Sequence, residues 1–367
     1  MDILTGARIF DGTRFIEGEI GIEDGHFTAP GSGRRIDLGG GVLAPGLIDL
    51  QVNGGGGIML DGRATVARIA TICEAHARLG TTGLLPTLIT DSRAATQSVL
   101  AAGIAAVPRV PGFLGLHLEG PHLDPRRPGC HPPQHIRPMD EDDILILLEA
   151  KTGLPALMLT VAPCAVTAEQ IARLTAAGIV VSLGHAEATM TEVRACVAAG
   201  ARGLTHLFNA MSPLGSREPG MVGAGLTLPL ACGLIADGIH VCDDTMRLAL
   251  RLAEERIYLV TDAMAVAGTE MTEFPLAGRR ILRQAGALRL ENGTLAGADL
   301  TLPEAVRHVI GLGLAPEQAL AMVTTRPARL IGAEARIAPG LPANMVHFDD
   351  DWRLTRVWQA QAKSSTA

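Results

Sequence analysis

The sequence lacks closely spaced cysteines and any excess of positive charge. Its 6 cysteines lie singly along 367 residues, with no C-x-x-C pair, which favours reduced thiols over a disulfide framework. The formal net charge is -7 at pH 7, so no general basic field attracts anions. Nucleic acid is therefore not an expected partner, and an anionic ligand would have to be held by a few local cations and backbone N–H groups.

Long apolar runs and targeting signals are also missing. No apolar stretch approaches the roughly 20 residues of a membrane-spanning helix. The first residues lack the cationic, apolar and small-residue order of a secretion signal. No internal repeat recurs at a fixed period. We therefore expect a cytoplasmic enzyme with no membrane partner.

Apolar residues are abundant enough for one large domain with a smaller one beside it, since 47% of the sequence is hydrophobic. Near the N-terminus, short strands are expected at 3–10, 17–22 and 35–38, broken by Gly and Asp turns. After residue 45, helical periodicity alternates with apolar strand-like segments. Past residue 340 short strands return, at 345–348 and 354–358.

The alternation in residues 45–339 is typical of an α/β fold, a (β/α)8 TIM-like barrel. A helix is expected at 65–79, and barrel strands at 83–88, 113–119, 157–161, 179–184, 203–206, 232–235 and 257–261. Residues 1–44 and 340–362 are expected to pair into one small β-sandwich domain beside the barrel.

Polar side chains stand where several of these strands end, on the face where such barrels build active sites. Glu119 shares a strand face with His117 and is either a metal ligand or a carboxylate satisfied by its neighbours. His185 and His206 end two later strands. A lone histidine on an apolar strand is usually a core residue, but two at successive strand ends together with Glu119 favour a metal site.

Asp262 ends another apolar strand. Burying a carboxylate without a partner is costly, so its side chain should face the polar mouth of the barrel. It is either a helix N-cap or a general base, and the strand-end position that it shares with Glu119, His185 and His206 favours the base.

Taken together, these segments resemble the amidohydrolase superfamily. The residues of the motifs are similar to those of the family of N-acetylglucosamine-6-phosphate deacetylases. The motifs that carry this resemblance lie at 42–49, 117–131, 183–189, 205–211, 217–220, 237–240, 261–263 and 295–297. The resemblance implies that N-acetyl-D-glucosamine 6-phosphate is hydrolysed to D-glucosamine 6-phosphate and acetate by metal-activated water. It makes Glu119, His185 and His206 the ligands of a divalent ion, in the first place Zn²⁺ with Fe²⁺, Co²⁺ or Mn²⁺ as alternatives. Asp262 becomes the catalytic base and acid.

The resemblance also assigns residues to the substrate. It places His131 beside the acetyl carbonyl. The residues that it assigns to binding of the sugar phosphate and hydroxyl groups are Asn209, Ala210, Arg217 and His240. Further sugar contacts fall at Cys130, Asp237, Gly238, Ile239, Leu295, Ala296 and Gly297. Taken from the residues alone, Cys130 is a small core thiol. Arg217 either forms an ion pair at the surface or binds a phosphate through two N–H groups of its planar guanidinium. Members of the family pair as homodimers with the phosphate pocket near the subunit contact, which leaves two alternatives: both phosphate-binding cations come from one chain, or one comes from the neighbouring chain.

One metal ion per chain is expected instead of two. Many amidohydrolases carry His-x-His on the first barrel strand, whereas this sequence has Gln51 and Asn53 there, whose neutral amide oxygens are weak ligands for a zinc-like ion. His122 is either a loose second-metal ligand or a wall of the pocket. Two other functions remain open: the same reaction on N-acetylgalactosamine 6-phosphate, and a catalytically silent sugar-phosphate sensor.

Overall fold

The computed structural model describes residues 1–360. Its centre is a sheet of 8 strands that follow one another in chain order and run parallel. They are β8 (Leu47–Val52), β11 (Thr81–Ile89), β12 (Gly115–Glu119), β13 (Ala156–Val161), β14 (Val180–Leu183), β15 (Gly203–Leu204), β16 (Ala231–Leu234) and β17 (Ile257–Leu259). A parallel bridge from Val52 to Ala263 brings the end of the first strand to the segment after the last, so the sheet nearly closes into a barrel.

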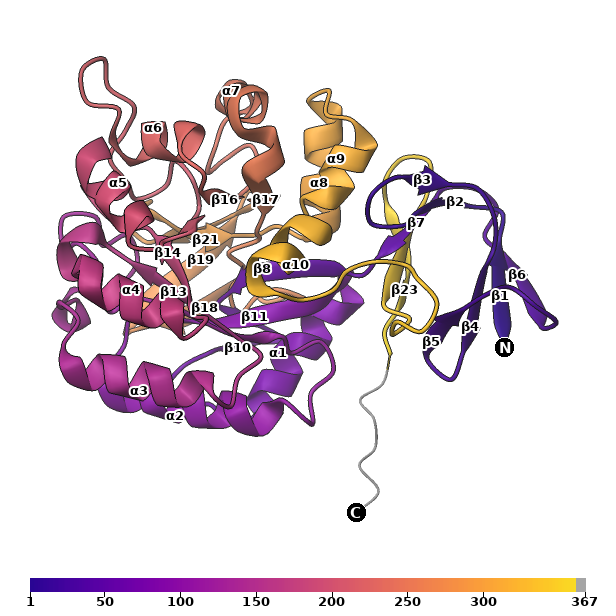
Figure 1. Ribbon diagram of the computed structural model, residues 1–367, viewed down its shortest axis with the longest axis horizontal. Coiled ribbons are helices and arrows are strands. Elements are labelled where there is room, and N and C mark those ends of the chain that lie inside the picture. The colour runs from indigo at the N-terminus through magenta and orange to yellow at the C-terminus, as the bar shows by residue number, and fades with distance from the viewer. Residues whose placement is uncertain (361–367) are drawn as a thin grey trace.

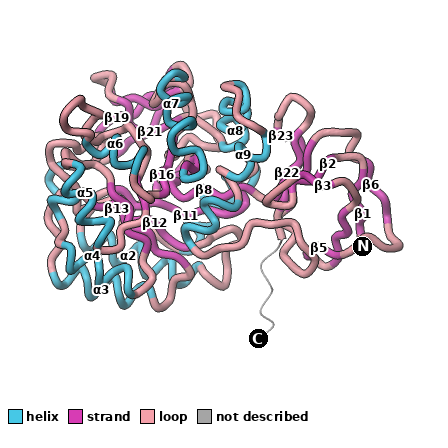
Figure 2. The backbone as a smooth tube through the Cα atoms, turned by 45° about the horizontal axis from the view of Figure 1, so that its top comes forward, coloured by secondary structure: helices cyan, strands magenta, loops and turns pink. Residues whose placement is uncertain are grey.

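Helices cover the outside of this sheet (Figures 1 and 2). They are α1 (Val66–Arg78), α2 (Arg93–Ala106), α3 (Glu141–Lys151), α4 (Ala168–Ala176), α5 (Met190–Ala198), α6 (Gly220–Thr227), α7 (Asp243–Ala253), α8 (Leu302–Gly311), α9 (Pro316–Ala321) and α10 (Thr325–Ile331). Several begin at a polar cap, as where the Thr189 hydroxyl accepts the N–H of Glu192. Such caps satisfy helix N–H groups and fix where each loop ends. The expected helix at 65–79 is α1 with its two caps.

The core of the barrel explains why its strands read as continuous apolar runs. All residues of β11, β12 and β13 are buried, as parallel strands covered on both faces must be.

At the carboxyl end of β12 only glycine fits. Gly120 has a φ of 84°, and a Cβ there would lie 2.2 Å from the Thr90 hydroxyl oxygen. This glycine lets the strand stop directly after Glu119.

The two ends of the chain form small sheets beside the barrel (Figure 1). One has the order β5-β4-β1-β6 and the other β23-β22-β7-β2-β3. Their strands are β1 (Asp2–Thr5), β2 (Arg8–Phe10), β3 (Phe15–Ile16), β4 (Ile20–Glu23), β5 (His26–Thr28), β6 (Arg34–Asp37), β7 (Val42–Pro45), β22 (Met345–Phe348) and β23 (Leu354–Trp358). The predicted fold class, a barrel with a β-sandwich built from both termini, is confirmed. The domain limits at 44 and 340 stay a prediction, and residues 361 and 362 of the predicted range lie outside the described residues.

Two features differ from the expectation. The single strand expected at 3–10 is two strands, β1 and β2, because Gly6 between them has a φ of 81° and turns the chain. A hairpin of β9 (Gly54–Gly55) and β10 (Ile58–Met59) and a 4-stranded antiparallel sheet, here called the inserted sheet, were not expected. The inserted sheet comprises β18 (Glu273–Leu276), β19 (Arg279–Gln284), β20 (Ala287–Leu290) and β21 (Leu295–Ala298). Apolar residues on its inner face pack near the active-site mouth, around Met264 and Cys130.

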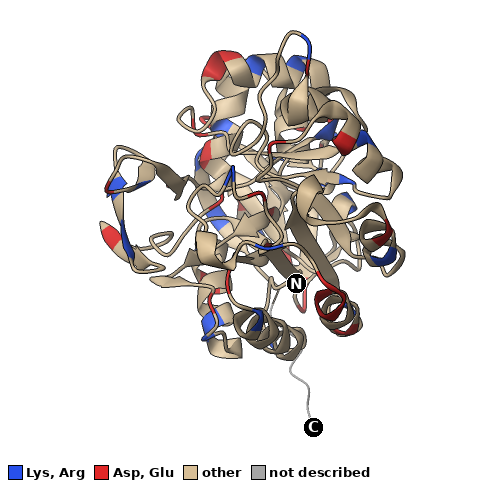
Figure 3. Ribbon diagram, turned by 90° about the vertical axis from the view of Figure 1, so that its left-hand side faces the viewer, with Lys and Arg blue, Asp and Glu red and all other residues tan. Residues whose placement is uncertain are grey.

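Charge is distributed over the outside of the molecule. Figure 3 shows basic and acidic residues interspersed on the surface helices and loops. None of the helices within residues 1–360 combines the length and the apolar character that a bilayer crossing requires.

Candidate active site

Most of the residues predicted to form the site line one cavity of about 390 Å³ at the carboxyl ends of the barrel strands. These are Glu119, Cys130, His131, His185, His206, Asn209, Ala210, His240, Asp262, Leu295 and Ala296. Within the described part of the chain, the other predicted residues are not in its lining: Arg217, Asp237, Gly238, Ile239 and Gly297. The cavity has the volume of a small-molecule site.

Left-handed backbone conformations turn the strand-end side chains toward the cavity. His185, His206 and Asp262 have φ values of 46°, 30° and 50°. Such values are uncommon for residues with a Cβ and cost of order 1–3 kcal/mol each, so they persist where the surrounding structure holds them. Three of them at the ends of β14, β15 and β17 mark this rim as a functional region.

The side chains of Glu119, His185 and His206 converge on one point. Glu119 Oε1 lies 3.0 Å from His206 Nε2 and 3.4 Å from His185 Nε2, and the two Nε2 atoms are 3.0 Å apart. Ligands held about 2.05 Å from a tetrahedral ion would be about 3.3 Å from one another. The spacing of these three atoms therefore fits a single shared ion.

Hydrogen bonding prepares His185 to bind a cation. Its Nδ1–H donates to the carbonyl oxygen of Arg127 at 2.9 Å, so the lone pair of the neutral ring is on Nε2, the atom that faces Glu119. Burial alone would raise the pKa of the Glu119 carboxyl, but the adjacent imidazoles of His185 and His206 hold that pKa well below its usual range. The cluster therefore presents a buried carboxylate beside an imidazole lone pair, which suits a divalent cation.

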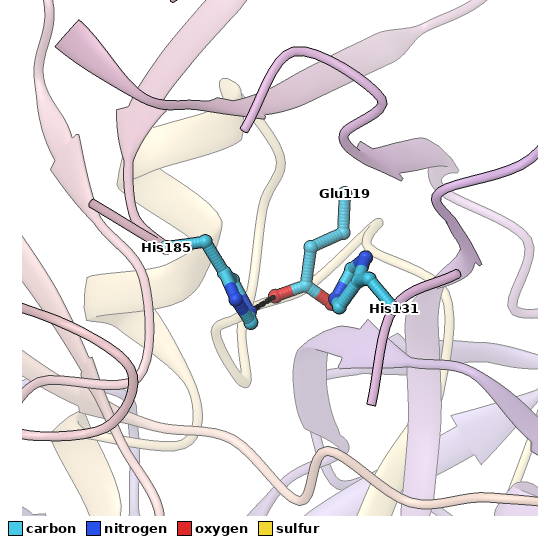
Figure 4. Close-up of side chains that lie close together, drawn as sticks. All are labelled: Glu119, His131 and His185. Atoms are coloured by element: carbon cyan, nitrogen blue, oxygen red, sulfur yellow. Dashed lines mark ion pairs between the residues drawn. The ribbon is translucent and has the colours of Figure 1, made fainter. Parts of the chain in front are cut away.

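His131 lies on the other side of Glu119 (Figure 4). One ligand atom each from Glu119, His131 and His185 falls within 4.8 Å of the others, so distance alone makes His131 a possible ligand. Its hydrogen bonds indicate otherwise. The backbone N–H of Thr90 donates to His131 Nδ1 at 3.2 Å, and burial lowers the His131 pKa to about 3. The neutral ring then carries its proton on Nε2, which lies 3.8 Å from Glu119 Oε2, and is a hydrogen-bond donor.

Thr90 is a functional residue that the sequence reasoning missed. Its hydroxyl also lies 2.8 Å from His131 Nδ1, and it follows directly on the end of β11 at Ile89. The rule that singled out the other strand-end polar residues would have found it, because it directly follows an apolar strand, one residue beyond the partner of Glu119 on the neighbouring strand.

Amide side chains of the first barrel strand lie between the two site carboxylates. Gln51 Nε2 donates to Glu119 Oε1 at 3.0 Å and to Asp262 Oδ1 at 3.1 Å, and Asn53 Nδ2 donates to Asp262 Oδ1 at 2.6 Å. Burial, reinforced by the charge of Glu119, raises the pKa of Asp262 to about 7. A carboxyl with a pKa near neutrality is suited to take up and release a proton.

His240 lies at another part of the cavity wall and is oriented by Asp237. The His240 Nδ1–H donates to Asp237 Oδ2 at 2.6 Å, and Asp237 Oδ1 accepts the backbone N–H groups of Ile239 and His240, both at 2.8 Å. The carboxylate of Asp237 therefore supports His240 instead of facing the cavity. Arg217 is exposed on the loop before α6, outside the cavity lining.

The inserted sheet holds the loop that carries His131. The Cys130 thiol donates to the carbonyl oxygen of Ala296 in β21 at 3.3 Å, and the Arg279 guanidinium of β19 donates to the Cys130 carbonyl oxygen. Burial raises the pKa of the Cys130 thiol to about 12, so it is a thiol and not a thiolate near neutral pH. These contacts make Cys130 an anchor of the cavity wall.

Comparisons with known proteins agree with this geometry. The model of the amidohydrolase family matches residues 42–366. An N-acetylgalactosamine-6-phosphate deacetylase of Shewanella sp. (strain ANA-3) is 42% identical, over 88% of this chain and 83% of its own length. An N-acetylglucosamine-6-phosphate deacetylase of Haemophilus influenzae is 33% identical, over 88% of this chain and 86% of its own. The crystal structure of N-acetylglucosamine-6-phosphate deacetylase from Pasteurella multocida superposes with a TM-score of 0.93 at 30% identity and covers 98% of both chains. The chain belongs to the amidohydrolase family and, within it, groups with these hexosamine-phosphate deacetylases.

Proposed function

We propose that this protein hydrolyses the acetamide of N-acetyl-D-glucosamine 6-phosphate to D-glucosamine 6-phosphate and acetate. The observation that supports this most directly is the convergence of Glu119, His185 and His206 beside Asp262, in one cavity of about 390 Å³. The relatives support the choice of substrate class, because the proteins from Haemophilus influenzae and Pasteurella multocida are named for this reaction.

The second candidate substrate is N-acetylgalactosamine 6-phosphate, which differs only in the configuration at C4. The Shewanella relative, at 42% identity, is named for that sugar. Both sugars present the same acetamide and phosphate, so the groups proposed to bind and cleave them are shared. The choice between the two epimers depends on the part of the cavity that faces the C4 hydroxyl.

We propose that Glu119, His185 and His206 hold one divalent ion per chain, Zn²⁺ in the first place, with Fe²⁺, Co²⁺ or Mn²⁺ as alternatives. The 3.0 to 3.4 Å separations of their ligand atoms fit such an ion, as does the free lone pair of His185 Nε2. Bound there, the ion would supply Lewis acidity, which activates water near neutral pH and polarises a carbonyl.

The protein's own side chains would move the protons. Asp262 would accept a proton from the attacking water and then donate it to the departing sugar nitrogen. His131 would donate its Nε2–H to the acetyl oxygen as negative charge develops there. Asn53 and Gln51 hold the Asp262 carboxylate through Oδ1, which leaves the second oxygen for this proton transfer.

For the phosphate we propose His240 together with Arg217 of the partner subunit. His240 lines the cavity, whereas Arg217 of the same chain is exposed and lies outside the cavity lining. A homodimer in which the loop before α6 reaches the neighbouring cavity would supply the second cation. Charge-assisted hydrogen bonds from two cations would then hold the phosphate in a protein of net charge -7.

The reaction is tested by measuring acetate release from four sugars: N-acetylglucosamine, N-acetylgalactosamine and the 6-phosphate of each. We expect rapid release from a phosphorylated sugar and much slower release from both free sugars. A larger kcat/KM for the galacto phosphate would select the second candidate. No acetate from metal-loaded protein that still binds the sugar phosphates would contradict a deacetylase and support the silent sensor.

The phosphate assignment predicts the effect of removing each cation. His240→Ala and Arg217→Ala should each raise KM for the phosphorylated sugar by about 10- to 100-fold, the loss of one charge-assisted hydrogen bond. The value of kcat should change less, because the phosphate is bound alike in the ground and transition states. Arg247→Ala is the matched control, since Arg247 is a half-exposed arginine paired with Asp244 on α7. Unchanged KM in both variants would mean that the phosphate lies elsewhere.

Mixing two impaired subunits tests whether Arg217 acts across a dimer. When Arg217→Ala and Asp262→Asn chains reassort at random, about a quarter of all sites should combine an intact Asp262 with an intact Arg217 of the partner subunit. At a substrate concentration well below the KM of the Arg217→Ala protein, the activity of the mixture should therefore exceed the sum of its two components. If Arg217 served its own chain, the mixture would have only the summed activity of its two components.

A further inference from the structure

A chain of buried polar side chains crosses the barrel from strand to strand. The Ser182 hydroxyl lies 2.7 Å from that of Thr205, which lies 2.6 Å from that of Thr160. Thr160 Oγ1 is 2.7 Å from His117 Nε2, and His117 Nδ1 is 3.0 Å from the carbonyl oxygen of Leu50. We call Ser182, Thr205, Thr160 and His117 the polar belt. None of its four members is more than 1% exposed.

The direction of every hydrogen bond in the polar belt follows from its last acceptor. The Leu50 carbonyl can only accept, so His117 donates from Nδ1. With its single proton on Nδ1, the imidazole has its lone pair on Nε2, which accepts from the Thr160 hydroxyl at 2.7 Å. With its proton used, Thr160 accepts from Thr205. Thr205 in turn accepts from Ser182.

The polar belt connects the strands that carry the proposed metal ligands. His117 lies two residues before Glu119 on β12, Thr205 directly precedes His206, and Ser182 is on β14, which leads to His185. Leu50, the final acceptor, directly precedes Gln51, which donates to Glu119. The remaining member, Thr160 of β13, is the central link. Each proposed ligand is thereby tied to the others by hydrogen bonds inside the barrel.

Stability alone does not require hydroxyl groups at these positions. Barrel interiors are filled mainly by branched apolar side chains, and a buried hydroxyl is tolerated only where it is hydrogen-bonded. A directed chain of such bonds fixes rotamers and strand separations more narrowly than apolar packing does. Hydrogen bonds outside the set of metal ligands are known to fix the orientation of ligands in other proteins.

We propose that the polar belt sets the relative positions of Glu119, His185 and His206, with Thr160 and His117 as positioning residues for the metal site. This inference rests on the proposed metal site and adds to it a set of residues that touch neither metal nor substrate. Because Thr160 bonds both neighbours, removing its hydroxyl breaks the belt in the middle and leaves His117 Nε2 without a donor.

The test compares Thr160→Val with Thr160→Ser. Valine has the shape of threonine without the hydroxyl, whereas serine keeps the hydroxyl. Zn²⁺ affinity is measured by competition with a chromogenic chelator. The valine variant should bind Zn²⁺ about 10- to 100-fold more weakly than the unsubstituted protein, and the serine variant should return to within about threefold of it. With saturating Zn²⁺, the valine variant should lose kcat with little change in KM.

Thr324→Val is the matched control. Thr324 is fully buried, and its hydroxyl donates to the Leu320 carbonyl at 2.7 Å, away from the polar belt. Its loss should lower the melting temperature and leave Zn²⁺ affinity unchanged. If Thr160→Val lowers the melting temperature with the same unchanged Zn²⁺ affinity, the belt is only structural and the inference is wrong.

Ring-nitrogen NMR of the metal-free protein separates this inference from the proposed function. His117 should be the Nδ1–H tautomer in all three proteins, because the Leu50 carbonyl accepts from Nδ1 in each. The Nε2 resonance should shift only in Thr160→Val, which loses the hydrogen bond from the Thr160 hydroxyl. If the unsubstituted protein binds no Zn²⁺, the metal site is wrong, whatever the tautomer. A Nε2–H tautomer in the unsubstituted protein would overturn the belt itself.

Should Thr160→Val fail to fold, Ser182→Ala is the alternative variant, because it removes only the first donor of the belt. It should weaken Zn²⁺ binding by about threefold, a smaller loss than that of a full outer-shell contact. Unchanged Zn²⁺ binding in Ser182→Ala would count against the belt.

Discussion

Replacing Asp262 with asparagine is expected to lower kcat by about 10³- to 10⁴-fold, the upper range for loss of a general acid–base. The amide oxygen of asparagine can still accept from Gln51 and Asn53, which bond Asp262 Oδ1 at 3.1 and 2.6 Å. The side chain therefore keeps its place but cannot take a proton. The same loss should appear in kcat and in kcat/KM, because the proton is transferred only in the transition state.

The measurement pairs steady-state acetate release with metal content and melting temperature. The variant should hold as much metal as the unsubstituted protein, since Asp262 is not among the proposed ligands. A matched comparison is His240→Ala, which should change mainly KM. An Asp262→Asn protein with kcat within about tenfold of the original would remove Asp262 from the mechanism, because general acid–base catalysis contributes at least about 10²-fold.

The barrel was predictable from sequence because its signals are local. Each buried strand is a short apolar run and each helix has its own period and cap, so α1, β13 and β22 lie within about one residue of the expected limits. The inserted sheet was not predictable in this way. It is part of no βα repeat, and its strands are short and lack a clear period of two, as in Arg279–Gln284, where two adjacent apolar residues lie between basic ones.

The site was predictable wherever a polar side chain directly ended an apolar strand. That rule found Glu119, His185, His206 and Asp262, which the fold brings to one cavity. It could not find the left-handed φ values that aim three of these side chains, because local sequence does not specify such conformations for residues with a Cβ.

The tautomers of His131 and His185 also could not be predicted from the sequence. They depend on the Thr90 N–H and the Arg127 carbonyl, which are backbone atoms of other segments. Almost any residue can supply a backbone N–H or carbonyl group, so the identity of a residue does not show that it bonds an imidazole. Motifs alone therefore cannot say which imidazole nitrogen faces the proposed metal. The different hydrogen-bond partners of the two histidines follow only from the folded structure.

Removal of the metal is expected to abolish turnover, and one equivalent per chain is expected to restore it. The proposed ligands offer three donor atoms, Oε1 of Glu119 and Nε2 of His185 and His206, which suffices for a catalytic site with one position open to water. A second ion would have to share Glu119 and Asp262, but the space between these carboxylates is spanned by the Gln51 amide, whose nitrogen donates to both. The amide NH₂ group occupies that space and presents partial positive charge to both carboxylates, which disfavours a second cation between them.

Chelator-washed protein should therefore show acetate release lowered by at least about 10³-fold. Titration with Zn²⁺ should restore activity linearly and stop at about one equivalent, as counted by elemental analysis of the same samples. Gln51→His provides a sharp comparison, since an imidazole would replace the bridging amide with a ligand that zinc prefers. That variant should take up additional Zn²⁺, while Glu119→Gln should lose affinity for the first ion. Two equivalents required by the unsubstituted protein would show that Gln51 and Asn53 bind metal through their oxygens, with the amides turned opposite to the orientation that the hydrogen bonds to Glu119 and Asp262 define.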